Sequence, residues 1–200
     1  MKNIGYKFFR FVLKPVYKFY YNPKIYNKEV LKGLESPLIF AGNHIHIMDQ
    51  NNVIISTNKV ITYMAKKEYF DSAKTRWFFK IVGCIPVDRE GDATPATNKA
   101  LEVLKGNGNI GIFPEGTRNK TKEKLLPFKF GTVSMANKTN ATIVPYAIVG
   151  EYKFRSKTLK VKFGTPFKVE NGDLEKANTY LRNTISDMID ELNEMNKTEK

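Results

Sequence analysis

Short apolar segments alternate with helix-like segments through the middle of the chain, and this alternation constrains the fold more than any other feature. The strand-like segments span residues 37–42, 60–65, 84–87, 109–113, 142–149 and 158–163. The helix-like segments span residues 50–57, 67–72, 74–82, 93–106 and 130–138. Such alternation is typical of an α/β layer. We therefore predict a mixed, largely parallel central sheet flanked by helices.

The C-terminal third adds two more patterns. In 158–163, apolar residues alternate with lysines, so we expect one wet face on this strand, as at the edge of a sheet. Residues 173–196 place apolar side chains at helical spacing, and Asp173 or Asn171 can cap the helix. We predict that this amphipathic helix closes the fold.

Residues 4–21 are dominated by aromatic and aliphatic side chains, with a basic residue every three or four positions. This spacing predicts an amphipathic helix, which Pro15 is expected to kink or divide. Such a helix can lie on a membrane surface with its basic side chains at anionic headgroups. We predict an N-terminal membrane-association segment over 1–32 and a second domain over 33–200. The alternative is a helix that packs on the core and only exposes its lysines.

The charge of the chain narrows the choice of partner. The 33 basic and 20 acidic residues give a net charge of +13, which points to an anionic partner such as a nucleic acid, a phosphorylated metabolite or an acidic lipid. No recognised nucleic-acid motif appears, so we expect a membrane surface and no nucleic acid. No apolar run approaches the ~20 residues of a spanning helix. The expected location is peripheral, on the cytoplasmic face of the membrane.

The first candidate catalytic residues are His44 and Asp49. The chain has two histidines, His44 and His46, and both follow the predicted strand 37–42. Histidine is the side chain best suited to act as a general base near neutral pH. His44 and Asp49 can meet if the first lies in the turn after the strand and the second begins the next helix, where the carboxylate would orient the imidazole. Alone, the spacing also fits a turn histidine beside a helix-capping aspartate.

A second candidate site follows the predicted strand 109–113, where Pro-Glu-Gly-Thr-Arg spans 114–118. Arg118 can hold a phosphate through two hydrogen bonds, and Gly116 allows a backbone to approach closely. The alternative is a surface turn with a local pair between Glu115 and Arg118. The single cysteine, Cys84, lies in an apolar strand-like run and is interpreted as buried filler rather than as a nucleophile.

Together, these two segments resemble the motifs of the glycerolipid acyltransferase family, in particular its bacterial 1-acylglycerol-3-phosphate acyltransferases. The first is Asn43-His44 with Asp49 five residues after the histidine, and the second is Phe-Pro-Glu-Gly-Thr-Arg at 113–118. Further segments resemble the family's other blocks in the family's order, namely 65–68, 83–89, 128–131 and 143–147. The resemblance extends over about residues 36–166.

One position departs from the family's pattern. The family usually has a serine where this chain has His46, which leaves His46 without an assigned role. A zinc site formed by His44, His46 and Asp49 is an alternative, but no cysteine or third histidine supports it. We expect no bound metal and no bound cofactor.

The resemblance implies transfer of a fatty acyl group from acyl-CoA or acyl carrier protein to the free hydroxyl of a lysophospholipid, 1-acylglycerol-3-phosphate, with phosphatidic acid as the product. His44 would act as the base and Asp49 would orient it. The substrate-binding residues that the resemblance implies are Arg89, Glu115, Gly116, Thr117, Arg118, Lys66 and Lys67. The alternatives are another lysolipid or glycerol-3-phosphate as acceptor, or a non-catalytic basic protein that binds lipid or nucleic acid.

Overall fold

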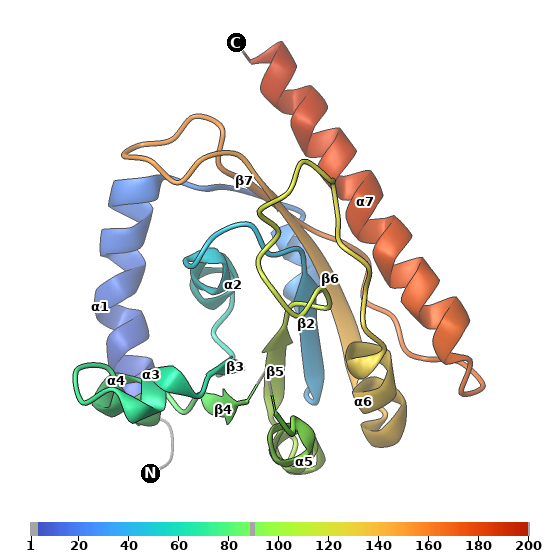
Figure 1. Cartoon of the computed structure of the whole chain (residues 1–200). Coiled ribbons are helices and arrows are strands. Elements are labelled where there is room, and N and C mark those ends of the chain that lie inside the picture. Colours follow the sequence, from blue (N-terminus) through green and yellow to red (C-terminus); the bar gives the residue numbers. More distant parts are fainter. Residues whose placement is uncertain (1–3, 89–90, 200) are drawn as a thin grey trace.

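A seven-stranded sheet forms the centre of the computed structural model, which describes residues 4–88 and 91–199 (Figure 1). The strands are β1 (Lys24–Tyr26), β2 (Leu38–Gly42), β3 (Thr62–Lys66), β4 (Ile85–Val87), β5 (Asn109–Ile112), β6 (Thr142–Val149) and β7 (Lys160–Phe163). The helices are α1 (Ile4–Tyr21), the 3-10 helix η1 (Lys28–Leu31), α2 (Asp49–Ser56), α3 (Glu68–Asp71), α4 (Arg76–Ile81), α5 (Thr94–Lys105), α6 (Gly131–Thr139) and α7 (Leu174–Thr198).

Five of the strands run in one direction, which confirms the predicted mixed and largely parallel sheet. The strand order is β1-β7-β6-β2-β5-β3-β4. Strand β2 is parallel to β5 and β6, and β3 is parallel to β4 and β5. Strand β7 is antiparallel to β6, and β1 is parallel to β7. The carboxyl ends of the five parallel strands therefore share one edge, where sites form in α/β proteins.

Helices cover both faces of the sheet. Figure 1 shows α7 on the face opposite to α1 and α2. One hydrophobic core lies between the sheet and helices α5, α6 and α7, with Ile39 and Leu181 fully buried in it. The second core lies on the α2 face and includes Phe40 and Val53, which are also fully buried. Neighbouring residues of β2 thus enter opposite cores, as the alternation of a strand requires.

Two tyrosines lie flat over glycines on this second face. Tyr146 pairs with Gly42, and Tyr63 pairs with Gly111. A Cβ atom at Gly42 would lie 2.3 Å from the Tyr146 ring, and one at Gly111 would lie 2.2 Å from the Tyr63 ring. Any residue other than glycine at position 42 or 111 would therefore place its Cβ atom in the space that the tyrosine ring occupies.

The sequence predicts most elements within two residues of their ends, but it misplaces the edge of the sheet. Strand β7 is not at the edge, because β1 pairs with it in the register Lys24 to Lys160. Lys160 is fully buried, and its Nζ lies 3.0 Å from Glu199 near the end of α7. The expectation of a wet face on residues 158–163 is therefore wrong for Lys160. Strand β1 has only three residues and too little alternation to be recognised from sequence.

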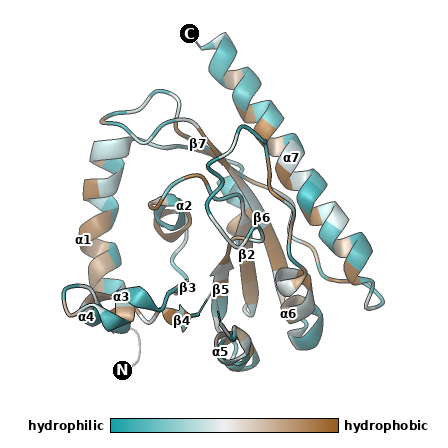
Figure 2. Cartoon of the chain, viewed as in Figure 1, coloured by the Kyte–Doolittle hydropathy of each residue, from teal (hydrophilic) through white to brown (hydrophobic). Residues whose placement is uncertain are grey.

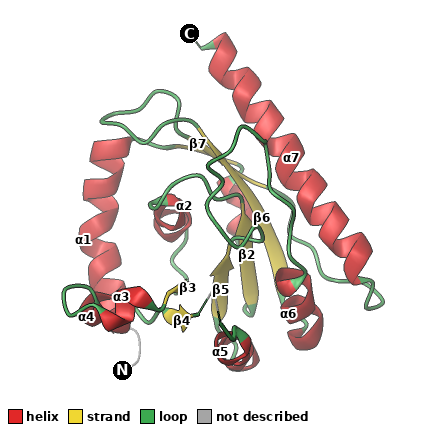
Figure 3. Ribbon diagram, viewed as in Figure 1, coloured by secondary structure: helices red, strands yellow, loops and turns green. Residues whose placement is uncertain are grey.

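Helix α1 continues unbroken through Pro15, so the expected division does not occur (Figure 3). Both Pro15 and Phe11 are exposed, so water can bind the Phe11 carbonyl that Pro15 leaves without a donor. Hydrophobic residues occupy much of α1 (Figure 2), and Phe8 and Phe11 are 61% and 79% exposed. Within residues 4–88 and 91–199, no helix is long and apolar enough to cross a membrane.

The same helix also packs on the rest of the chain. Tyr6 and Tyr17 are buried, so α1 combines a packed face with an exposed aromatic one. Strand β1, which also belongs to the predicted membrane-association segment, is part of the central sheet through its pairing with β7, and η1 follows β1 in the chain. The boundary between residues 32 and 33 stays a prediction.

Candidate active site

His44 and Asp49 meet at the carboxyl end of β2. The Nδ1 atom of His44 lies 2.8 Å from Oδ2 of Asp49, which is fully buried and begins α2. The same oxygen accepts hydrogen bonds from the backbone amides of Ile45 and His46, each at 2.7 Å. The carboxylate thus holds the turn between β2 and α2 closed. Because Nδ1 is engaged by Asp49, Nε2 is the ring nitrogen available to take a proton from a substrate.

The loop from residue 113 to 130, between β5 and α6, holds the backbone of His44 on both sides (Figure 3). Glu115 Oε1 accepts a hydrogen bond from the amide of His44 at 2.8 Å, and the amide of Asn119 donates to the carbonyl of His44 at 2.7 Å. Phe113 stacks on the imidazole, with the ring centroids 3.9 Å apart and the planes 9° from parallel. The imidazole is therefore held both by the turn between β2 and α2 and by the residues that follow β5.

Glu115 is buried, and both of its oxygens accept hydrogen bonds from backbone amides. The second is the amide of Leu126, which donates to Oε2 at 2.8 Å. Burial raises the pKa of the Glu115 carboxyl, and the bonds from Leu126 and His44 oppose that rise. The Glu115 carboxyl therefore connects two distant parts of the loop 113–130 with each other and with the turn between β2 and α2.

A chain of hydrogen bonds continues from the other oxygen of Asp49. The hydroxyl of Tyr152 donates to Asp49 Oδ1 at 2.6 Å, and the amide nitrogen of Asn52 lies 2.7 Å from that hydroxyl. The hydroxyl of Tyr17, on α1, donates to the amide oxygen of Asn52 at 3.1 Å. Burial is the main cause that raises the pKa of both tyrosines, and the negative charge of Asp49 raises it further.

Sequence reasoning missed Tyr152, Asn52 and Tyr17. Tyr152 follows β6 just as His44 follows β2, so the rule that sites form at strand ends could have selected it. Asn52 lies three residues after Asp49, on the same side of α2. Tyr17 carries no comparable signal within an aromatic helix.

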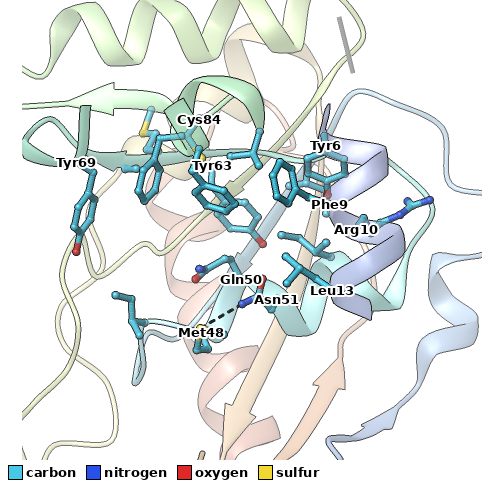
Figure 4. A pocket seen from close by; sticks show the side chains of 18 of the residues that line it. Tyr6, Phe9, Arg10, Leu13, Met48, Gln50, Asn51, Tyr63, Tyr69 and Cys84 are labelled. Atoms are coloured by element: carbon cyan, nitrogen blue, oxygen red, sulfur yellow. Dashed lines mark hydrogen bonds between the residues drawn. The ribbon is translucent and has the colours of Figure 1, made fainter. Parts of the chain in front are cut away.

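A cavity of about 250 Å³ opens beside His44. Tyr6, Phe9 and Leu13 extend into it from α1, and Tyr63 lines it from β3 (Figure 4). Its wall also contains side chains from α2, α3 and α4, and it is mostly apolar. His44 lies in the wall of a space suited to an aliphatic chain.

The structure brings some of the predicted substrate-binding residues to this cavity and not others. Arg118 and Lys66 line it together with His44. Lys67 is not part of the lining, and its Nζ lies 3.8 Å from an oxygen of Asp88. Thr117 is exposed.

The two other predicted substrate-binding residues are Gly116 and Arg89. Gly116 has a φ of +72°, a conformation that favours glycine, beside the side chain of Lys129. Arg89 lies outside the described residues.

His46 has a packing contact that the sequence left open, and Cys84, expected to be buried filler, lies in the cavity wall. The ring of His46 stacks on Tyr152 with centroids 4.2 Å apart, and its Nδ1 accepts a hydrogen bond from the amide of Met48 at 3.3 Å. In the described part of the chain, no three His, Cys, Asp or Glu side chains are grouped so that they could hold a metal ion. Cys84 is half-buried in the cavity wall, and burial raises the pKa of its thiol to about 11.

Comparisons with known proteins agree with this arrangement. A family model described as Acyltransferase matches residues 22–149. The 1-acyl-sn-glycerol-3-phosphate acyltransferase of Bacillus subtilis (strain 168) is 33% identical over 166 residues, which cover 80% of this chain and 81% of that protein. The enzyme of the same name from Cocos nucifera is 29% identical over 170 residues, and the match covers 80% of this chain but 55% of that protein.

One solved structure is similar over almost the whole chain. It is the crystal structure of the 1-acyl-sn-glycerophosphate (LPA) acyltransferase PlsC from Thermotoga maritima, with a TM-score of 0.73 and 22% sequence identity. The similarity covers 92% of this chain and 80% of the other. At this identity the likeness shows that the two chains share a fold.

Proposed function

The chain belongs to the acyltransferase family, and we propose that it transfers a fatty acyl group to the free hydroxyl of 1-acylglycerol-3-phosphate, giving phosphatidic acid. The proposed donor is a thioester on coenzyme A or acyl carrier protein. The observation that carries the proposal is the pairing of His44 with a buried Asp49 in the wall of an apolar cavity that Arg118 also lines.

The proposed mechanism needs no covalent enzyme intermediate. His44 takes the proton of the acceptor's hydroxyl through Nε2, and Asp49 stabilises the imidazolium that forms. The resulting alkoxide attacks the thioester carbonyl and forms a tetrahedral intermediate. That intermediate collapses to the new ester, and the departing thiolate takes the proton back from His44. Cys84 is a poor alternative nucleophile, because a thiol with a pKa of about 11 is almost entirely protonated at neutral pH.

We assign the acceptor's phosphate to Arg118 and Lys66, the two predicted cations that line the cavity with His44, where Arg10 and Lys14 of α1 are also part of the lining. Arg89 remains a proposed member of this group. The roles assigned to Gly116 and Thr117 are to shape the turn that presents Arg118. Glu115 is assigned to the same turn, where it holds the backbone of His44. Holding hydroxyl, base and thioester together supplies much of the expected acceleration.

We further propose that the protein works on an anionic membrane surface, on its cytoplasmic face. Helix α1 supports this, because it exposes Phe8 and Phe11 to solvent and lines the cavity with Phe9 and Leu13. A lipid acceptor could therefore reach His44 close to the helix that contacts the bilayer. The net charge of +13 favours anionic lipids.

The test is to incubate the purified protein with 1-acylglycerol-3-phosphate and either acyl-CoA or acyl carrier protein loaded with an acyl chain, followed by mass analysis of the lipids. We expect phosphatidic acid, and the H44A variant should be slower by about 10²–10⁴-fold while keeping the circular dichroism spectrum of the parent protein. Glycerol-3-phosphate and a monoacylglycerol without phosphate serve as competing acceptors. Full activity of H44A would refute the assignment of the base, and vesicle binding without any transfer would indicate a non-catalytic protein.

A further inference from the structure

The inner face of α1 is connected to the catalytic carboxylate by hydrogen bonds. Tyr17 is only 5% exposed, and its hydroxyl lies 3.1 Å from the amide oxygen of Asn52 on α2. Asn52 is fully buried and donates to the hydroxyl of Tyr152, which in turn donates to Asp49. Three side chains from α1, α2 and the loop after β6 thus form one chain of hydrogen bonds, buried at Tyr17 and Asn52 and half-buried at Tyr152.

The direction of every bond in this chain is fixed by chemistry. An ionised Asp49 can only accept, so the Tyr152 hydroxyl must give its proton to Oδ1. That hydroxyl must then accept from a donor, which is the NH₂ group of Asn52. The amide oxygen of Asn52 is left as an acceptor, and the hydroxyl of Tyr17 supplies its proton. The bonds that lead from Asn52 to Asp49 therefore have one consistent direction, while the Tyr17 hydroxyl also lies 3.4 Å from a second acceptor, the carbonyl of Met48. The loss of one member leaves its neighbour without a partner.

The position of Tyr152 gives it control over the plane of the Asp49 carboxylate. Oδ2 is held by His44 and by the amides of Ile45 and His46. Tyr152 holds the other oxygen, Oδ1. With Oδ1 released, only the bonds to Oδ2 fix the plane of the carboxylate, so the carboxylate can turn about its bond to Cβ and change the angle at which Oδ2 meets His44 Nδ1.

We propose that Tyr152, Asn52 and Tyr17 are positioning residues that connect the position of α1 against α2 to the orientation of the Asp49 carboxylate. Through Asp49 they also affect the orientation of the His44 ring. This inference rests on the proposed function for its kinetic consequence. The longest of the three bonds, at 3.1 Å, is the one that crosses from α1 to α2. A shift of α1 on the membrane surface would therefore break the network at Tyr17.

The kinetic test removes one hydroxyl at a time and leaves each ring in place. We expect Y152F to lower kcat by about tenfold or more, because it removes a hydrogen bond to a charged group. Y17F should lower kcat by about threefold, since it acts two bonds further away. The KM for 1-acylglycerol-3-phosphate should stay unchanged in both. The matched control is Y20F, on the same helix, where the side chain is 47% exposed; it should keep the parent kcat.

Two further measurements separate positioning from membrane binding and from the proposed function. Flotation with anionic vesicles should be the same for Y17F, Y20F and the parent protein. Long-range ¹H–¹⁵N NMR of the two histidine rings, assigned with the H46Q variant, needs no acyl substrate. We expect Y152F to shift the Nδ1–H signal of His44, and Y20F to leave it in place.

The outcomes are distinct. Parent values of kcat and an unshifted His44 signal in both Y152F and Y17F would overturn the positioning role. A fall in kcat for Y17F that is matched by an equal loss of vesicle binding would assign that residue to the membrane contact alone, against the proposal. If the parent protein transfers no acyl group to any acceptor, the proposed function fails, and the NMR comparison still decides whether the network orients His44.

Discussion

The carboxylate of Glu115 accepts the backbone amide of His44 at 2.8 Å, so the end of β5 holds the residue that follows β2. Its other oxygen accepts the amide of Leu126. A glutamine at this position can accept only one of these two bonds and presents an NH₂ group to the other donor. We expect E115Q to lower kcat by about 10–100-fold and to reduce the free energy of unfolding by about 1–3 kcal/mol. E123Q, an exposed change in the same loop, is the control.

The pH dependence of that stability has a definite sign. Burial raises the folded-state pKa of Glu115 above its ordinary value of 4.5. Its stabilising contribution is therefore complete below the unfolded pKa and declines as the pH rises through the folded pKa. The E115Q variant does not titrate there, so its loss of stability should be larger at pH 4 than at pH 7. Urea unfolding at both pH values measures this difference. An equal loss of stability at both would show that folding does not raise the pKa of the Glu115 carboxyl.

Arg118 should act on binding of the acceptor more than on the chemical step. It lines the cavity beside His44, and its guanidinium can hold a phosphate through two hydrogen bonds. R118A is expected to raise the KM for 1-acylglycerol-3-phosphate by about 10–100-fold with a smaller change in kcat. K122A removes an exposed cation from the same loop and controls for net charge. An unchanged KM in R118A would remove this residue from the phosphate site.

The exposed aromatic residues of α1 should contribute to binding at a bilayer. Full burial of a phenylalanine side chain is favourable by about 1.5–3 kcal/mol, so replacing Phe8 and Phe11 with serine should weaken flotation with anionic vesicles by at least tenfold. Raised salt should weaken it further by screening the lysines. Y180S, on α7 at the opposite face of the sheet, is the control (Figure 1). Equal flotation of all variants would contradict membrane contact through α1.

Cys84 should react slowly with thiol reagents while the protein is folded. A pKa of about 11 leaves roughly one thiol in a thousand ionised at pH 8, and the thiolate is the reactive form. The labelling rate should increase with pH up to that range and should rise sharply in urea. Added 1-acylglycerol-3-phosphate should slow labelling, because Cys84 lines the cavity. Fast labelling at neutral pH that the lipid does not affect would place the thiol outside the cavity.

The pairing of His44 with Asp49 was predictable because its geometry depends on chain order. A strand joined to a helix by residues 43–48 brings His44 and Asp49 together in the turn, and both elements could be identified from their apolar patterns. Likewise, Arg118 follows a parallel neighbouring strand, so its proximity to His44 follows from the sheet. Asp173 caps α7 by accepting the amide of Lys176, as its position before the helix predicted.

Other features could not be predicted, because their partners leave no trace in the sequence. Glu115 binds backbone amides, which every residue possesses, so its role in holding His44 is visible only in three dimensions. Tyr152 is 103 residues from Asp49, and although its place after β6 marks it as a possible site residue, nothing in the sequence pairs it with Asp49. Lys160 looks like a surface residue until β1 and the end of α7 cover it.

The close fit of Tyr63 over Gly111 has a consequence for redesign. Tyr63 forms part of the cavity wall, whereas Gly111 does not. Even a methyl group at position 111 would push against the ring from behind, because a Cβ atom there would lie 2.2 Å from it. The depth of the cavity is thus set partly from a neighbouring strand, and it can be made shallower without replacing any of the cavity's own lining residues.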